Sequence, residues 1–139
     1  MTLDNLEREG FIKKLPADRR KVKDALNLAK RDIDTARNLL TKDYDWAFSI
    51  AYNAMLQTIR ALMFSKGYRP SGSNQHISVV RFAEIFLDEE IVIVFDRMRR
   101  KRHSTIYDTA GTISRKEAEN AVDMAKRLIQ EIEKMIKDK

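Results

Sequence analysis

The feature that most constrains the fold is a stretch over residues 44–65 that is apolar all round when it is placed on a helix. A helix with this distribution is normally central and buried, so the other helices must pack around it. We therefore expect its aromatic side chains in a core or an interface rather than as platforms for bases. Gly67 follows at the position where a glycine commonly ends a helix. The large apolar residues that cover the faces are Trp46, Phe48, Ile50, Tyr52, Met55, Ile59, Leu62 and Phe64.

Two further segments each carry a single apolar stripe at helical spacing. The first runs from Pro16, which suits the first turn of a helix because it lacks an N–H, to about Thr41. The second follows the sequence from Ser114 to Glu117, which has the form of a capping box. The two stripes are Val22, Leu26, Ala29, Ile33, Ala36 and Leu40, and then Ala118, Ala121, Ala125, Leu128, Ile132 and Met135.

The region between these segments predicts a loop and two more helices. Residues 68–73 combine proline, glycine and serine and are predicted to be a loop. Ser73 or Asn74 can cap the helix that follows, which presents Ile77, Val80, Ala83 and Leu87 on one face. Asp88 caps the next helix, which starts apolar and becomes strongly basic, and Gly111 marks its end.

These patterns predict an all-α fold, an up-and-down four-helix bundle with one additional short helix and no strands. Only four glycines and two prolines interrupt the 139 residues, and 43% of the residues are hydrophobic, enough for one core. No linker or internal repeat divides the chain. We expect a single domain over residues 1–139, with residues 1–14 as an N-terminal arm or short helix.

Composition also disfavours several classes of function. The chain has no cysteine, which excludes disulfides and thiolate metal sites. No apolar stretch reaches the roughly 18–20 residues that a membrane span requires, and the charged N-terminus does not have the form of a signal peptide. His76 and His103 lie too far apart in the sequence to suggest a zinc site by themselves. We expect a cytoplasmic protein without a bound metal or cofactor and without membrane contact.

The excess of positive charge favours an anionic partner. The formal net charge is +6 and the isoelectric point is about 9.6, which attracts polyanions such as nucleic acid without conferring specificity. The cations are densest over residues 97–108, the basic run, which has the sequence RMRRKRHSTIYD. Such crowding of like charge on a helix is unfavourable unless an anion relieves it.

Helical spacing divides the basic run. Arg102 continues a line with Phe95, Met98 and Ile106, so we expect its side chain to be partly buried. A second line contains Arg99, His103 and Tyr107, while Arg100 and Lys101 point to solvent.

Metal-free RNA cleavage could use these residue types. It needs a proton acceptor or donor such as histidine and a fixed cation such as arginine to hold the scissile phosphate. Tyrosine can add a hydrogen bond or stack on a base. On residue chemistry alone, a solvated basic helix end is the simpler interpretation. His76, in the first turn of its helix beside the loop, is more simply a surface residue than part of a cleft.

At this point the chain resembles a known family, the HEPN domains. Three segments carry the resemblance, which together spans about residues 20–135. They are Asp43-Tyr44-Asp45-Trp46-Ala47 with the helix that continues through Ala51-Tyr52-Asn53-Ala54-Met55 and Ile59-Arg60-Ala61-Leu62, then Lys66-Gly67-Tyr68-Arg69-Pro70, and finally the basic helix ending in Tyr107-Asp108.

The resemblance implies a bundle of four main helices plus a short one, and a homodimer that pairs two copies of the basic helix around a cleft. Many HEPN domains are metal-independent ribonucleases, often toxins, and many of those are encoded beside a minimal nucleotidyltransferase that acts as antitoxin. Their motif is an arginine followed, after four to six residues, by a histidine.

Two registers of that motif fit the basic run. In one, Arg97 pairs with His103; in the other, Arg102 takes the arginine position and Tyr107 replaces the histidine. We favour the second, which matches a branch of the family that ends in Tyr-Asp and lacks the usual general base. The candidate catalytic residues are therefore Arg97, Arg102, His103 and Tyr107, and the candidate nucleotide- or RNA-binding residues are Arg99, Arg100 and Asp108.

Three functional hypotheses follow from the resemblance and the residues. The first is a dimeric nucleotide- or RNA-binding module that partners a minimal nucleotidyltransferase in a toxin–antitoxin-type pair. The second is a metal-independent RNA endonuclease in which His103 transfers protons and an arginine holds the phosphate. The third is a non-catalytic helical scaffold.

Overall fold

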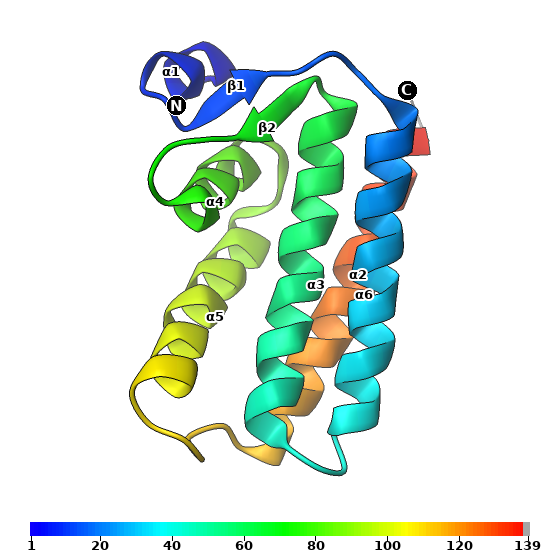
Figure 1. Cartoon of the computed structure of the whole chain (residues 1–139), viewed down its shortest axis with the longest axis vertical. Coiled ribbons are helices and arrows are strands. Elements are labelled where there is room, and N and C mark those ends of the chain that lie inside the picture. Colours follow the sequence, from blue (N-terminus) through cyan, green and yellow to red (C-terminus); the bar gives the residue numbers. More distant parts are fainter. Residues whose placement is uncertain (138–139) are drawn as a thin grey trace.

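The computed structural model describes residues 1–137 and contains six helices and two short strands within them (Figure 1). This confirms the predicted all-α class, a helical bundle with short additional elements. In chain order the elements are α1 (Leu3–Arg8), β1 (Ile12–Lys14), α2 (Arg19–Leu39), α3 (Tyr44–Ser65), β2 (Tyr68–Pro70), α4 (Gln75–Phe86), α5 (Glu89–Tyr107) and α6 (Arg115–Lys137).

The central position of α3 is confirmed. Helices α2 and α6 pack along one side of α3, and α5 lies along another, as Figure 1 shows. Helix α4 bridges α3 and α5 near the end of the bundle that also holds α1 and the strands. Among the described helices, α5 has its main contacts with α3 and α4 and none of comparable extent with α6 or α2. Helix α5, which carries the basic run, is therefore covered on one side only.

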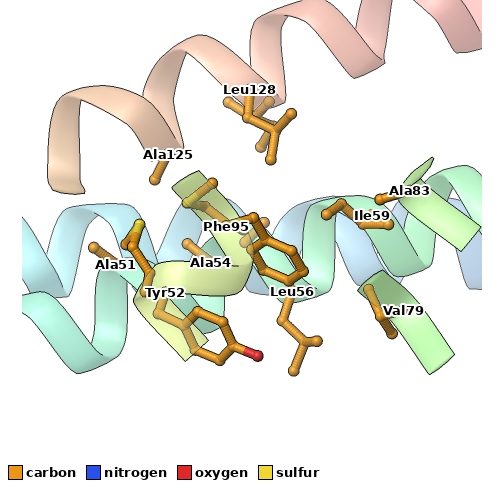
Figure 2. Packing of buried hydrophobic residues seen from close by; sticks show 14 of the residues in the cluster. Ala51, Tyr52, Ala54, Leu56, Ile59, Val79, Ala83, Phe95, Ala125 and Leu128 are labelled. Carbon is orange, nitrogen blue, oxygen red and sulfur yellow. The ribbon is translucent and has the colours of Figure 1, made fainter. Parts of the chain in front are cut away.

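One continuous core holds these helices together. Figure 2 shows Ala125 and Leu128 of α6 directed toward α3, with Tyr52 of α3 beside Phe95 of α5. The rings of Tyr52 and Phe95 stack with centroids 5.2 Å apart, and both side chains are fully buried. Burial of aromatic side chains is a main source of stability, so this stack contributes to the attachment of α5 to α3.

Two of the predicted caps, Asn74 and the Ser114–Glu117 box, form as expected, whereas Asp88 precedes α5 without a side-chain capping hydrogen bond. The carboxylate of Asp43 accepts a hydrogen bond from the backbone N–H of Trp46 at 3.1 Å, and Asn74 caps α4 through Ile77 at 3.2 Å. The capping box at the start of α6 is complete. There the Glu117 N–H donates to the Ser114 hydroxyl at 3.0 Å, and the Ser114 N–H donates to the Glu117 carboxylate at 3.1 Å. Each bond satisfies an N–H group that a helix start would leave unpaired.

The prediction of no strands, with residues 68–73 as a loop, was wrong for residues 68–70. Strands β1 and β2 form an antiparallel pair in which Ile12 lies opposite Pro70 and Lys14 opposite Tyr68. Three residues are too few to show the alternation that marks a strand, and the partner is far away in the sequence. Proline is tolerated here because the short ribbon leaves its missing N–H at an edge.

Two local predictions, one about the start of a helix and one about a side chain, also need correction. Helix α2 starts at Arg19 with Asp18 as its cap, so Pro16 lies before the helix and not in its first turn. The Asp18 carboxylate accepts a hydrogen bond from the Arg20 N–H at 2.9 Å, which sets the start. Trp46 is 52% exposed in the single chain and so is not a core residue, although the adjacent Ala47 and Phe48 are buried. Its place in an interface between chains stays a prediction.

The connection between α5 and α6 is tied to the start of α3. The Asp45 carboxylate accepts hydrogen bonds from the backbone N–H groups of Gly111 at 2.6 Å and Ile113 at 3.4 Å. Gly111 adopts a φ of 76°, a conformation that glycine reaches without steric cost. This link holds the C-terminal end of the basic helix near α3. No helix within residues 1–137 is long and apolar enough to cross a membrane.

Candidate functional site

Helix α5 directs the side chains of its basic run to three different surroundings. The first is the interface with α3 and α4, the second is the exposed outer surface, and the third is a groove between α5 and α6. Successive residues of a helix point about 100° apart, so neighbours in a dense run necessarily separate. Each surrounding must therefore be considered as a possible site by itself.

Arg102 lies in the interface, as its position on the apolar line predicted. Its guanidinium carbon is 5.5 Å from the centroid of the Tyr52 ring, a cation–π arrangement. The Tyr52 hydroxyl is 2.9 Å from Nδ1 of His76 on α4, and the two rings stack with centroids 5.8 Å apart. Residues from α3, α4 and α5 thus meet at one place, which we call the Arg102 site: Tyr52, His76, Arg99 and Arg102.

The Arg102 guanidinium is incompletely satisfied. Its Nε is buried and has no hydrogen-bond acceptor within residues 1–137. A buried donor of a charged group without a partner costs free energy, typically a few kcal/mol. Arg102 as a whole is half-buried, so the unpaired Nε marks an arginine whose donors the described residues do not fully satisfy.

Burial and positive charge set the protonation of the two partners of Arg102. Burial raises the pKa of Tyr52 well above its ordinary value, which the charges of Arg102 and Arg99 only partly oppose, so the hydroxyl keeps its proton. Burial also lowers the pKa of His76, and the nearby positive charges of Arg102, Arg99 and Arg60 lower it further. Near neutral pH the site therefore contains a neutral imidazole among arginines.

Arg99 and Arg100 share one acidic neighbour on their own helix. Arg99 Nε donates to the Asp96 carboxylate at 2.9 Å, and an Arg100 terminal nitrogen lies 3.8 Å from the other carboxylate oxygen. Arg99 is half-buried and adds its charge to the Arg102 site, whereas Arg100 is exposed. Exposed pairs of this kind are worth little, so Arg100 remains available to an anion.

His103, Tyr107 and Asp108 lie on the exposed surface of α5. The rings of His103 and Tyr107 contact each other with centroids 4.8 Å apart, and Tyr107 is 67% exposed. Asp108 is the residue that ends the helix, and its N–H donates to the Ser104 carbonyl at 2.9 Å. The structure thus brings His103 and Tyr107 together but turns both away from the ring of Tyr52, over which Arg102 lies.

Arg97 occupies the third surrounding. With Lys101 it lines a groove of about 460 Å³ between α5 and α6, floored by apolar side chains that include Phe48 and Met98. Lys101 pairs across the groove with Glu117 at 2.6 Å, and this hydrogen bond lowers the pKa of the Glu117 carboxyl. Neither motif register therefore has both members in one surrounding: Arg97 is separate from His103, and Arg102 is separate from Tyr107.

Sequence reasoning missed two members of the Arg102 site. Tyr52 was assigned to a core or interface and His76 to the surface, yet their hydrogen bond joins α3 to α4. The sequence offered only a weak signal for these two residues. Tyr52 and Arg60 are eight residues apart on α3, and His76 lies just after the N-cap of α4. Spacing identifies the face of one helix, but it does not say which face of another helix meets it.

The described part of the chain contains no candidate metal site. Within residues 1–137, no group of three or more histidine, aspartate or glutamate side chains is placed to hold a metal ion. The chemistry that the arrangement offers is recognition of an anion by arginine and imidazole groups.

Comparisons with known proteins agree with this fold. The family model described as HEPN domain matches residues 22–135. The crystal structure of TT1696 from Thermus thermophilus is similar, with a TM-score of 0.67 and 20% sequence identity over 82% of this chain and 97% of that one. The crystal structure of ST0689, an archaeal HEPN homologue, gives a TM-score of 0.64 and 16% identity over 83% of this chain and 97% of that one. No curated protein matches the sequence.

Proposed function

The chain belongs to the HEPN domain family, and from this premise we propose that it is a dimeric module that binds the phosphates of a nucleotide or of RNA through the Arg102 site. The observation that carries the proposal is the buried Nε of Arg102, which has no acceptor within residues 1–137. Arginine is the side chain best suited to phosphate, because its planar fork donates two hydrogen bonds to two oxygens. The net charge of +6 favours the approach of such a ligand.

The proposal includes a homodimer and a minimal nucleotidyltransferase as partner. What supports an additional interface is the position of α5, which packs on α3 and α4 and exposes its other side. That side carries His103 and Tyr107 together with Ile93, which is 47% exposed. A second chain or a partner protein placed there would cover apolar surface and adjoin the Arg102 site.

We expect the purified protein to bind a single-stranded RNA oligonucleotide or ATP at low salt. Raising the salt from about 50 mM to about 200 mM should weaken RNA binding severalfold or more, because each phosphate contact releases condensed counterions. Fluorescence anisotropy with labelled RNA measures the affinity, and light scattering on the same sample measures the oligomeric state.

The matched control is a peptide nucleic acid of the same base sequence, which presents the bases without phosphates and should not bind. If neither RNA nor ATP binds at low salt, the binding module is rejected and the helical scaffold becomes the better hypothesis. If the peptide nucleic acid binds as tightly as RNA, recognition does not depend on phosphate and the Arg102 site has no part in it.

A second candidate function is metal-independent RNA cleavage. It is favoured by the contact between His103 and Tyr107 on the exposed face of α5, one helical turn from Arg99. In such a reaction the 2′-oxygen attacks phosphorus, the bond to the 5′-oxygen breaks, and a 2′,3′-cyclic phosphate forms. A histidine takes the 2′-hydroxyl proton or protonates the departing oxygen.

We expect RNA to remain intact when it is incubated with the wild-type protein in EDTA, because the motif register that the sequence favours, Arg102 with Tyr107, has no histidine at the position of the general base. Gel analysis of end-labelled RNA measures cleavage. Cleavage that disappears in His103→Ala would contradict this expectation and make the protein an endonuclease. Cleavage that is equally fast in His103→Ala would indicate a contaminant or another catalytic group.

A further inference from the structure

The His76 side of the Arg102 site contains a second incompletely satisfied arginine. Arg60 of α3 is half-buried, and its guanidinium carbon lies 5.8 Å from the centroid of the Phe64 ring. Its Nε, like that of Arg102, is buried without a hydrogen-bond acceptor in the described chain. The positive charge of Arg60 also lowers the pKa of His76, and Arg60 lies about two helical turns beyond Tyr52 on α3.

The hydrogen bond from Tyr52 determines which nitrogen of His76 is free. Tyr52 is fully buried, and the contact with Nδ1 at 2.9 Å is the one hydrogen bond its hydroxyl makes within residues 1–137. A buried hydroxyl donates a hydrogen bond where an acceptor is present, so Nδ1 of the neutral imidazole accepts a hydrogen bond from the Tyr52 hydroxyl. The hydrogen of the neutral ring is then on Nε2, which can donate to an anion without any change of charge.

The same bond also tolerates a charged imidazole. When His76 is protonated, Nδ1 becomes a donor and the Tyr52 oxygen accepts. The hydroxyl proton can reorient, and the two rings need not separate. The hydroxyl hydrogen of Tyr52 then has no acceptor within residues 1–137, a cost that opposes protonation of His76 in the empty site.

We propose, on the basis that the Arg102 site binds phosphate, that His76 and Arg60 join Arg99 and Arg102 in a subsite for a doubly charged phosphate group, and that filling this subsite is coupled to proton uptake by His76. A terminal phosphate of a nucleotide or of an RNA end carries this charge near neutral pH, whereas a phosphodiester carries one. Four donor groups around one anion match the greater charge of the terminal phosphate better.

The charges that act on His76 come from two neighbouring helices. From α3 the charge is that of Arg60, and from α5 the charges are those of Arg99 and Arg102, while Asp96 of α5 acts on the neighbouring Tyr52. Asp96 is engaged by Arg99 and so does little to offset the cations. In the empty site the arginines oppose protonation of His76; a bound dianion offsets their charge and removes that opposition.

The sign of the pH dependence follows from this competition. The pKa of His76 is lowered in the empty site and is higher when the anion is bound. Well above both values the imidazole is neutral in both states, and the affinity does not depend on pH. As the pH falls between the two values, the bound state holds the extra proton, so the affinity must rise.

Sulfate is the probe for this linkage because it stays doubly charged over the relevant range, unlike phosphate. We expect sulfate to bind about 3- to 10-fold more tightly near pH 5.5 than near pH 7.5, which corresponds to a shift of up to about one pKa unit at His76. Calorimetric titration measures the affinity. The chain contains two histidines, so NMR of the ring protons follows His76 directly, with and without sulfate.

His76→Asn is the first test variant. The asparagine side-chain oxygen can accept a hydrogen bond from the Tyr52 hydroxyl, as Nδ1 does, but the asparagine side chain does not titrate. We expect weaker sulfate binding than in wild type near pH 7.5, because one donor to the anion is lost, and no increase in affinity at lower pH. The matched control is His103→Asn, the same substitution on the exposed face of α5, which should keep the pH dependence.

A second variant tests Arg60 independently of ligand binding. Arg60→Gln removes one positive charge near His76, so the pKa of His76 in the sulfate-free protein should move up toward its ordinary value. Sulfate affinity should fall about 3- to 10-fold, the loss of one charged contact. Thermal unfolding of each variant establishes that it is folded. The NMR titration of His76 in the wild-type protein tests the coupling without any variant.

The inference is overturned if sulfate leaves the His76 titration unchanged, or if His76→Asn retains the pH-dependent affinity. Sulfate that binds without affecting His76, while RNA or ATP still binds, would reject the subsite and leave the proposed function intact. Sulfate that shifts His76 while no nucleotide or RNA binds would support the subsite and reject the proposed function.

Discussion

Replacement of Arg102 by alanine is expected to weaken binding of RNA or ATP by about 10- to 100-fold, the equivalent of about 1.5–3 kcal/mol for a charge-assisted contact. The reason is that Arg102 lies over the Tyr52 ring and that its buried Nε has no acceptor within residues 1–137, so the described residues do not fully satisfy this guanidinium. Anisotropy titration at a fixed low salt concentration measures the effect.

Arg97→Ala is the matched control, because it removes the same charge from the same helix. Arg97 is exposed and faces the groove between α5 and α6, so we expect less than about a threefold change from its loss. The reverse result, with a large loss for Arg97→Ala and none for Arg102→Ala, would favour the register that pairs Arg97 with His103. Equal small losses in both variants would mean that binding depends on general charge alone.

Phe95→Ala is expected to destabilise the fold by about 3–5 kcal/mol, a large part of the roughly 5–15 kcal/mol that stabilises a typical domain. Phe95 is fully buried and stacks on Tyr52, and α5 has few other buried side chains because α6 does not cover it. The vacated space next to Tyr52 cannot easily be filled by residues from a second neighbouring helix. Urea denaturation followed by circular dichroism measures the loss.

Ile93→Ala is the control for Phe95→Ala. Ile93 lies on the same helix, is 47% exposed, and should cost less than about 1 kcal/mol in the monomer. A loss for Phe95→Ala no greater than that for Ile93→Ala would show that the stack is not what attaches α5. A large, concentration-dependent loss for Ile93→Ala would instead place Ile93 in the dimer interface.

The inward position of Arg102 was predictable from spacing alone. It follows Phe95 and Met98 at helical intervals, and in the structure it lies over a fully buried ring. The outward positions of His103 and Tyr107 were less clear, because a line of residues beside an apolar stripe can face either a neighbour or solvent. Here α4 is much shorter than α5 and does not extend along it as far as His103 and Tyr107.

The contact between Tyr52 and His76 was not predictable from the sequence. Tyr52 has the pattern of a core residue, and burial of its ring confirms that part of the prediction. Its hydroxyl needs a partner once it is buried, but any polar group that the fold brings nearby would meet that need. That the partner is His76 depends on how α4 crosses α3 after β2, and the β1–β2 pair that positions this crossing is too short to recognise.

By itself the sequence determined the main helices, some of their caps and the faces they bury, because these depend on side chains within a few residues of one another. It also determined that the chain is basic and that Arg102 points inward. Tertiary structure alone decided that Arg102 meets Tyr52 and His76 and that Arg97 is separated from them. The physical reason is that contacts between helices depend on crossing angles and end-to-end offsets, which arise from packing of the whole core and leave no periodic trace in the chain.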